Sequence, residues 1–223
     1  MAREFLRMSM LEARDLSDAW FLAIKEVMEH GYEYMVDRGS FENEQKRREL
    51  DMFAMLIKYP ATRPLIPDLR LGGGYPAPTS IQYVEDYFNR YLMSSLKTEN
   101  EQYTYGEDLE IQIEEVIKIL KEGKYNQNQT CMSVGGAKSI LLKDPQCLRM
   151  VQVRVRYGKL HFIVYFRSWD LWAGFPSNLA GLQLLKEYMA HEVGLEHGCT
   201  IALSGGLHLY DYSWPYAEKV LGK

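Results

Sequence analysis

The sequence predicts an α+β protein in which a mixed β-sheet packs with helices within one domain over residues 1–223. Apolar residues with helical spacing recur along the chain, and strand patterns lie between them without the regular rhythm of a parallel βαβ fold. A length of 223 residues is enough for one domain with a substantial core. With 47% apolar and 25% charged residues, the composition is that of an ordinary globular protein and not of a disordered chain.

The first predicted element is an amphipathic helix. Its apolar residues step by three and four over 16–28. Either Asp15 or Ser17 is available as the N-cap, and Gly31 follows the last turn. The spacing therefore predicts a helix that buries one face.

A strand and a long irregular loop are predicted next. The stretch 39–49 is mostly polar and charged, and apolar residues over 50–57 then favour a strand. The strand should end at Pro60, because the residue before a proline is biased away from helix. Prolines and glycines over 64–78, including those at 72–74, predict a loop and not a domain boundary.

The remaining patterns alternate between helix and strand. Helical spacing over 81–92 and 113–120 predicts two helices, and a third such pattern covers 182–189. Alternating apolar residues over 151–155 and an apolar run over 160–166 predict a hairpin around a Tyr-Gly turn. A further strand is predicted over 200–203, before a Gly-Gly break.

Charge and cysteine content limit the partners and the compartment. The 26 Lys and Arg against 30 Asp and Glu give a net charge of −4, which argues against a broad nucleic-acid surface. Cys131, Cys147 and Cys199 are an odd number in a chain of this size, so we expect reduced thiols. No apolar run approaches ~18 residues, so we expect no membrane association and a cytoplasmic location.

The densest group of chemically active side chains lies over 167–178, after an apolar strand. Arg167 with the adjacent hydroxyl of Ser168 suits a phosphate, because the guanidinium offers a planar fork of donors. On spacing alone, an ordinary surface pair between Arg167 and Asp170 is an equally good interpretation.

Three further residues have both a chemical and a structural interpretation. Cys147 near an arginine could be a nucleophilic thiolate, although a single cysteine is more often a small buried apolar residue. His208 and Tyr210 are two apart, so they would share one face of a strand and could both donate to a sugar hydroxyl. A half-buried aromatic pair is the alternative.

Taken together, these segments resemble the thymidylate synthase family. The strongest part of the resemblance covers 144–210, and the short chain is most like the archaeal branch. Tyr105-Gly106 and Glu85, before aromatic residues, extend the likeness upstream. The motifs that carry it are Pro145-Gln146-Cys147, Arg167-Ser168-Trp169-Asp170, Gly174-Phe175-Pro176-Ser177-Asn178-Leu179-Ala180 and Gly205-Gly206-Leu207-His208-Leu209-Tyr210.

The resemblance implies a covalent mechanism on a pyrimidine nucleotide. Cys147 would add to C6 of dUMP, while Arg167 would bind the phosphate and favour the thiolate. Glu85 and Tyr105 would manage proton transfers through water. The other implied substrate contacts are Ser168 to the phosphate, Asn178 to the uracil edge, and His208 and Tyr210 to the ribose hydroxyl.

The resemblance also implies a cosubstrate and an assembly. Asp170 would hold the pterin ring of the cosubstrate and Gly174 would allow its close approach. The cosubstrate would be methylene-tetrahydrofolate or a methylene-tetrahydromethanopterin-type pterin, supplying both the one-carbon unit and the hydride, with no metal. The protein would be a homodimer that converts dUMP to dTMP.

Some positions depart from the family pattern and leave alternatives open. The arginine pair donated across the dimer should fall at Gln127-Asn128, so its charge would come from elsewhere, with Arg47 or Arg48 as candidates. Gly206 stands where an aspartate is expected, and only the range 211–223 follows the last motif. Without a long closing tail, a dUMP or dCMP hydroxymethylase is one alternative, and a noncatalytic nucleotide- or pterin-binding paralogue is the other.

Overall fold

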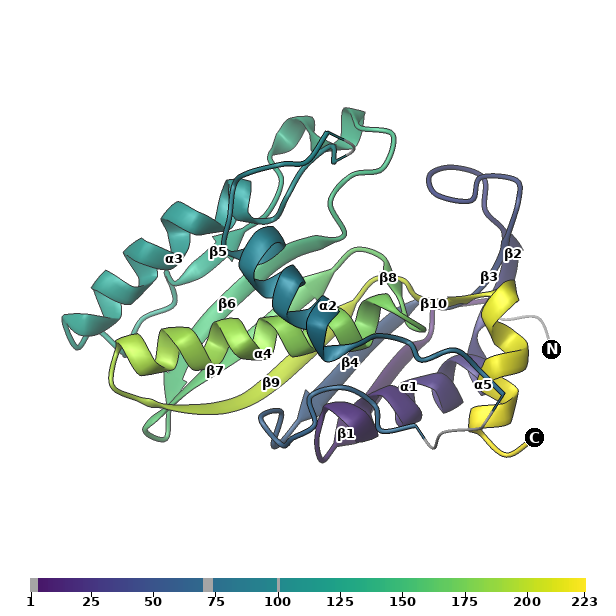
Figure 1. Ribbon diagram of the computed structural model, residues 1–223, viewed down its shortest axis with the longest axis horizontal. Helices are drawn as coiled ribbons and strands as arrows, with labels where there is room; N and C mark the ends of the chain where they lie inside the picture. The colour runs from purple at the N-terminus through teal and green to yellow at the C-terminus, as the bar shows by residue number, and fades with distance from the viewer. Residues whose placement is uncertain (1–3, 70–73, 100) are drawn as a thin grey trace.

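The computed structural model describes residues 4–69, 74–99 and 101–223 and has the predicted α+β architecture. Its described part forms a six-stranded and a four-stranded mixed sheet with helices packed against them (Figure 1). A single cluster of buried apolar residues joins both sheets to the helices.

The larger sheet has the order β1-β4-β9-β7-β6-β5 and contains parallel and antiparallel pairs. The predicted hairpin is confirmed as β6 and β7, which turn at Tyr157-Gly158, where both residues have positive φ. The strands are β1 (Met8–Ala13), β4 (Met52–Ile57), β5 (Cys131–Ser133), β6 (Leu148–Arg156), β7 (Lys159–Phe166) and β9 (Glu196–Ser204).

The smaller sheet has the order β2-β3-β10-β8. Its strands are β2 (Tyr32–Met35), β3 (Lys46–Leu50), β8 (Trp169–Asp170) and β10 (Leu207–Tyr210). The chain passes from one sheet to the other after β1, β3, β7, β8 and β9. The last three crossings bring the carboxyl ends of β7 and β9 next to the smaller sheet.

The strand predicted over 50–57 is wrong as a single element. The chain breaks at Asp51, whose carboxylate accepts the backbone N–H of Arg7 at 2.9 Å, so β3 ends at Leu50 in one sheet and β4 begins at Met52 in the other. The preceding polar stretch contains β3 itself. The loop over 64–78 is irregular where described, and its residues 70–73 lie outside the described part.

The helices are α1 (Leu16–His30), α2 (Ile81–Asp86), α3 (Gly106–Lys121), α4 (Gly174–Glu192) and α5 (Trp214–Val220), with a π-helical turn η1 (Tyr87–Leu92) and short 3-10 turns η2 (Ala137–Leu141) and η3 (Asp211–Ser213). The N-cap of α1 is Asp15, one of the two predicted candidates, and its carboxylate accepts the N–H of Asp18 at 2.9 Å. Gly31 ends this helix.

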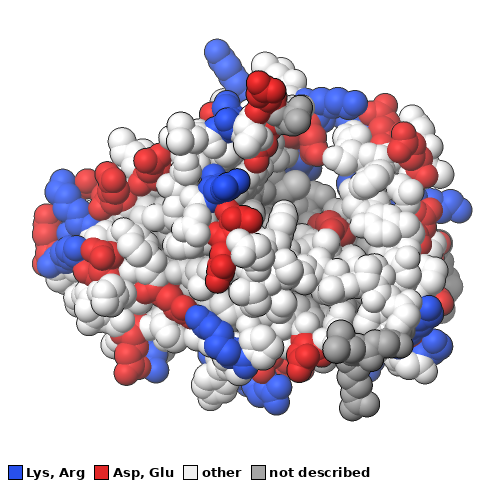
Figure 2. Space-filling view, viewed as in Figure 1, with Lys and Arg blue, Asp and Glu red and all other residues white. Residues whose placement is uncertain are grey.

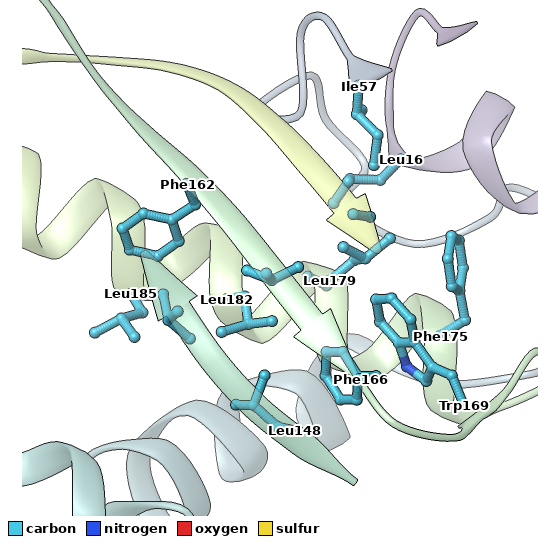
Figure 3. Close-up of a cluster of buried hydrophobic side chains, with 14 of the residues drawn as sticks. Leu16, Ile57, Leu148, Phe162, Phe166, Trp169, Phe175, Leu179, Leu182 and Leu185 are labelled. Carbon is cyan, nitrogen blue, oxygen red and sulfur yellow. The ribbon is translucent and has the colours of Figure 1, made fainter. Parts of the chain in front are cut away.

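Helix α4 lies across the larger sheet and forms the centre of the core (Figure 1). Its apolar residues meet aromatic side chains of β7 and β8, as Figure 3 shows. Phe166 stacks on Trp169 with ring centroids 3.8 Å apart, and both are buried. This packing fixes the end of β7 relative to the start of α4, which is where the candidate site lies.

Lys186 is a fully buried amine on α4 that supports a bulge in β9. His161 of β7 stands opposite both Gly198 and Cys199, so their backbone groups are outside the regular ladder. The amine of Lys186 donates to the carbonyls of Gly198 (2.8 Å) and Cys199 (3.2 Å), and His161 Nδ1 accepts the N–H of Cys199 at 3.0 Å. The His161 and Cys199 pair therefore has a structural explanation.

The face of the larger sheet opposite α4 is less covered. Along β7 and β9 fully buried residues alternate with half-buried ones, and the half-buried set includes Ile163, Ile201 and Leu203. At the edge of the same sheet, Met8 and Met10 of β1 are largely exposed. In the described ranges, no helix combines the length and apolar character needed to cross a membrane.

Candidate active site

The candidate site lies where β6 and β7 meet the smaller sheet. Cys147 directly precedes β6 and Arg167 directly follows β7, and the backbone N–H of Arg167 donates to the carbonyl of Cys147 at 2.8 Å. Figure 2 shows that the surface is hollowed between the β2–β3 hairpin and the segment that carries η2. The hairpin loop reaches this segment, since Ser40 donates to the carboxylate of Asp144 at 2.8 Å.

The thiol of Cys147 is half-buried, and this burial raises its pKa. The positive charges of Arg167 and Arg47 oppose the rise, whereas Asp144 and Asp170 add to it. The expected influence of Arg167 on the thiolate is present in direction, but burial outweighs it. Arg167 is itself held by Asp144 at 3.0 Å and by the carbonyls of Pro145 and Gln146.

Tyrosines pack around the nucleophile candidate. The hydroxyl of Tyr105 accepts the N–H of Leu148 at 3.2 Å, so this tyrosine lies beside the residue that follows Cys147. Its ring contacts those of Tyr91 and Tyr103 at centroid distances of 4.9 and 5.9 Å. Sequence reasoning missed these two partners, although the density of tyrosines between positions 83 and 105 was visible.

Glu85 lies on α2 with an exposed side chain, whereas Val84 and Tyr87 of the same segment are buried. The helix gives way to a π-helical turn at Tyr87, two residues after Glu85. The role that the resemblance implies for Glu85 in proton transfer stays a prediction. Of the two buried neighbours of Glu85, only Tyr87 carries a polar group.

A cationic cavity of about 360 Å³ adjoins Arg167. Arg38, Lys143 and Arg149 also line it, and Asp144 is the acidic residue among its lining residues. Ser139 supplies the hydroxyl group in the lining of this cavity, whereas Ser168 is buried and does not line it. The phosphate contact that the resemblance implies for Ser168 stays a prediction.

Gly135 allows the wall of this cavity to form. Its φ is +72°, and a Cβ atom there would lie 2.5 Å from both Arg149 Nη1 and Ser139 Oγ. Its carbonyl accepts from Arg149 at 3.1 Å, and its N–H donates to Asp108 at 2.7 Å. Sequence reasoning missed Arg38 and Arg149, because only the folded chain brings the hairpin and β6 together.

Of the two arginines proposed to supply charge, Arg47 faces the site. Its guanidinium donates to the hydroxyl of Tyr210 at 2.7 Å and lies 5.0 Å from the centre of that ring. Arg48 points to the other face of β3, where it stacks on Trp214 and pairs with Glu33 at 2.6 Å. Alternation along the strand separates the two residues.

His208 and Tyr210 lie on β10 with their rings 4.9 Å apart, edge to face. The Nδ1 atom of His208 is 3.0 Å from the carbonyl of Gly206, which can only accept, so Nδ1 carries the proton. Burial, assisted by the charge of Arg47, lowers the pKa of His208 to about 3. Its Nε2 is therefore an acceptor, buried without a partner, and not the donor that the sequence suggested.

A carboxylate from β3 occupies the space beside Gly206. A Cβ atom on Gly206 would lie 3.1 Å from the carboxyl carbon of Glu49, and that carboxylate is 3.6 Å from His208 Nδ1. The hydroxyl of Tyr34 donates to it at 2.8 Å. Glu49 thus supplies an acidic group where the family motif would have an aspartate, and sequence reasoning missed it.

Asn178 lies on the first turns of α4 and is held by Trp169. The indole Nε1 of Trp169 donates to Asn178 Oδ1 at 2.9 Å. Because an indole N–H can only donate, its partner must be the amide oxygen, and the amide nitrogen faces the other way. Asn178 can donate through this nitrogen and still accept through the second lone pair of its oxygen.

Asp170 and Gly174 meet at the start of α4. The carboxylate of Asp170 accepts the backbone N–H groups of Trp172 (3.2 Å), Ala173 (3.1 Å) and Gly174 (3.1 Å). Burial raises the pKa of Asp170 against these hydrogen bonds. A Cβ atom on Gly174 would meet only ordinary contacts at 3.5 Å or more, so the protein itself leaves room there.

Fold and site together define an α+β protein with a half-buried thiol beside a cationic cavity and a fixed amide. Within the described ranges, no group of three or more His, Cys, Asp or Glu could hold a metal ion. A family model described as thymidylate synthase matches residues 90–223. The chain therefore belongs to the thymidylate synthase family.

Curated archaeal relatives cover nearly the whole chain. Proteins from Methanosarcina mazei and Methanosarcina acetivorans are 30% and 29% identical to it over 220 residues, which is 95% of this chain and 94% of each relative. A protein from Methanothermobacter thermautotrophicus is 26% identical, with 95% and 97% covered. All three carry the name "Putative thymidylate synthase". The likeness to these relatives thus includes the N-terminal part that the family model leaves out.

Proposed function

We propose that this chain is a one-carbon transferase that methylates dUMP to dTMP. The observation that carries this proposal is the placement of Cys147 beside Arg167, with the cationic cavity next to it. A plain structural thiol would not require a neighbouring group of cations. Family membership supports the same activity.

The proposed nucleotide contacts follow the charges of the site. Arg38, Arg149 and Arg167 would bind the phosphate, because guanidinium groups suit its oxygens geometrically and electrostatically. The unpaired Nε2 of His208 would accept a hydrogen bond from the ribose hydroxyl, and Tyr210 would donate to it. The amide nitrogen of the held Asn178 would then meet a base carbonyl.

The proposed chemistry begins at the thiol. Loss of the thiol proton to water in the recess gives the thiolate. Arg167 and Arg47 are the two positive charges near this thiolate, and Arg47 remains available when Arg167 binds the phosphate. Addition of sulfur to C6 forms the S–C6 bond and makes C5 an enolate carbon, which can attack an electrophilic methylene group. Tyr105, held on the backbone of β6, would position water at C5.

A reduced pterin would supply the methylene group and the hydride. The residues at the start of α4 fit it, because Asp170 offers a buried carboxylate and Gly174 leaves open space beside it. We propose methylene-tetrahydrofolate or a methylene-tetrahydromethanopterin-type pterin as this cosubstrate. Asp170 would accept N–H groups of the ring while it continues to cap α4.

We also propose a homodimer and a cytoplasmic location. The half-buried apolar residues on the uncovered face of the larger sheet support pairing with a second copy. The three cysteines are free thiols, as a reducing compartment would leave them. The single buried cluster supports treating 1–223 as one domain.

Tritium release from 5-tritiated dUMP tests the proposal, with and without each pterin class. Release that yields dTMP and is lost in Cys147→Ala is the expected result. If the product is hydroxymethyl-dUMP, the chain is a hydroxymethylase. Binding of dUMP without any release from either pterin would make it a noncatalytic paralogue.

A further inference from the structure

Tyr87 stands at the join between α2 and a π-helical turn. Helix α2 gives way to η1 at Tyr87, one residue after Asp86. Val84 and Tyr87 are three residues apart, so they share the buried side of this segment, whereas Glu85 between them is exposed.

Space for the ring of Tyr87 is made by a glycine on α4. A Cβ atom on Gly181 would lie only 2.5 Å from Tyr87 Cδ1, so a larger residue would displace the ring. Gly181 is three residues after Asn178, which places the ring beside the helix face that carries Asn178. The other side of the ring meets Tyr105 edge to face, with centroids 6.5 Å apart.

The hydroxyl of Tyr87 is buried, and no polar atom lies within hydrogen-bonding distance of it. Burial raises its pKa well above the usual value for tyrosine, so the hydroxyl keeps its proton. The side chain of Asn178 lowers this pKa through a longer hydrogen-bond contact, and a Cys147 thiolate would raise it further, so both groups lie beside the hydroxyl. A buried hydroxyl without a partner costs stability, which points to a ligand atom as its partner.

We propose that the Tyr87 hydroxyl donates a hydrogen bond to the O4 carbonyl of the pyrimidine base, next to the amide nitrogen of Asn178. The proposal rests on the proposed function. When the thiolate forms the S–C6 bond, the C5–C6 π electrons move through C4 onto O4. Tyr87 then acts as an oxyanion donor and transfers no proton, and Asn178 is the second donor.

The test compares Tyr87→Phe with Tyr83→Phe. Tyr87→Phe removes only the hydroxyl and keeps the ring against Gly181 and Tyr105. Tyr83→Phe is the matched control, because it removes the hydroxyl of an exposed tyrosine on α2. For both variants we would measure thermal stability, the Kd of dUMP by calorimetry and the rate of tritium release.

The expected result for Tyr87→Phe combines equal or higher thermal stability with weaker function. Removing an unpaired buried hydroxyl should not destabilise the fold. The Kd of dUMP should rise about tenfold for one lost hydrogen bond. Tritium release should fall on the order of 100-fold, because the donor acts most strongly on the developing oxyanion. Tyr83→Phe should leave all three quantities unchanged.

Several results would overturn the proposal. Wild-type tritium release in Tyr87→Phe, a marked loss of its thermal stability, or an equal loss of activity in Tyr83→Phe would each do so. If the wild type binds dUMP without turnover, the proposed methyl transfer fails and the Kd of Tyr87→Phe alone decides. A tenfold weaker Kd then supports Tyr87, and an unchanged Kd refutes it. Absence of dUMP binding by the wild type overturns both proposals.

Discussion

The indole of Trp169 should set the preference for uracil over cytosine. Its N–H holds the oxygen of Asn178 at 2.9 Å, so the amide presents its nitrogen to the base. Cytosine carries an amino group at C4 and would require the amide to turn over. That reversal would lose the hydrogen bond between Trp169 and Asn178. It would also leave the indole N–H of Trp169, which is only 2% exposed, without a partner.

The structure gives the size of this effect. The lost hydrogen bond and the unpaired buried donor together cost about 2 kcal/mol, which corresponds to roughly thirtyfold in the ratio of Kd values for dCMP and dUMP. Trp169→Phe keeps an aromatic ring on Phe166 and removes this donor. The amide of Asn178 should then turn freely, and the ratio should fall by roughly that factor.

Calorimetric titration of dUMP and dCMP checks this prediction. Trp172→Phe is the matched control, since Trp172 is equally buried but packs against Trp20 and Tyr216, away from Asn178. A folded Trp169→Phe variant with the wild-type ratio would refute the role of the indole. The same loss in Trp172→Phe would show that general packing, not the hydrogen bond, sets the preference.

Three further predictions concern other parts of the chain. Burial lowers the pKa of Lys186 to about 7. Above that pH the unfolded chain therefore binds more protons than the folded chain, and the free energy of unfolding should rise from pH 7 toward 10. For the wild type, the free energy of unfolding should rise by up to about 1.4 kcal/mol per pH unit. Chemical unfolding of Lys186→Met across the same pH range should not show this rise. Arg47→Ala should weaken dUMP binding about tenfold by titration, whereas Arg48→Ala should not, because Arg48 faces Trp214. Gly174→Ala should keep its thermal stability, since its new Cβ meets only ordinary contacts, but should raise the KM for the pterin; an unchanged KM would contradict the open-space argument.

Elements with local signals were predicted correctly. Helix α1 and the β6–β7 hairpin follow from apolar spacing, caps and a turn within one stretch of sequence. The small sheet was largely missed because β2 and β3 are short and charged, and their pairing with β10 is decided by residues far away in the sequence. Arg47 and Glu49 face the site and not the core, so β3 lacks the apolar alternation by which a strand is predicted.

The orientation of side chains around Glu85 could not be predicted from the sequence. Motif likeness fixes a position along the chain, but the direction of a side chain depends on helical register. The structure leaves Glu85 exposed and buries Tyr87 two residues later. The ring of Tyr87 packs against Gly181, a contact between residues far apart in the sequence.

The buried polar atoms without partners argue that this region is built for a ligand. Six such atoms occur among the described residues, and two of them are Gln45 Oε1 and Gln183 Oε1. The other four, Tyr87 Oη, His208 Nε2, Arg47 Nε and Gln146 Oε1, belong to residues at or next to the candidate site. Each costs stability in the free protein, and substitution by an apolar residue would remove that cost. Structural packing alone does not explain why they gather around Cys147. A nucleotide with phosphate, hydroxyl and carbonyl groups offers a partner to each kind of atom, so the free-energy cost in the unliganded fold becomes binding energy in the complex.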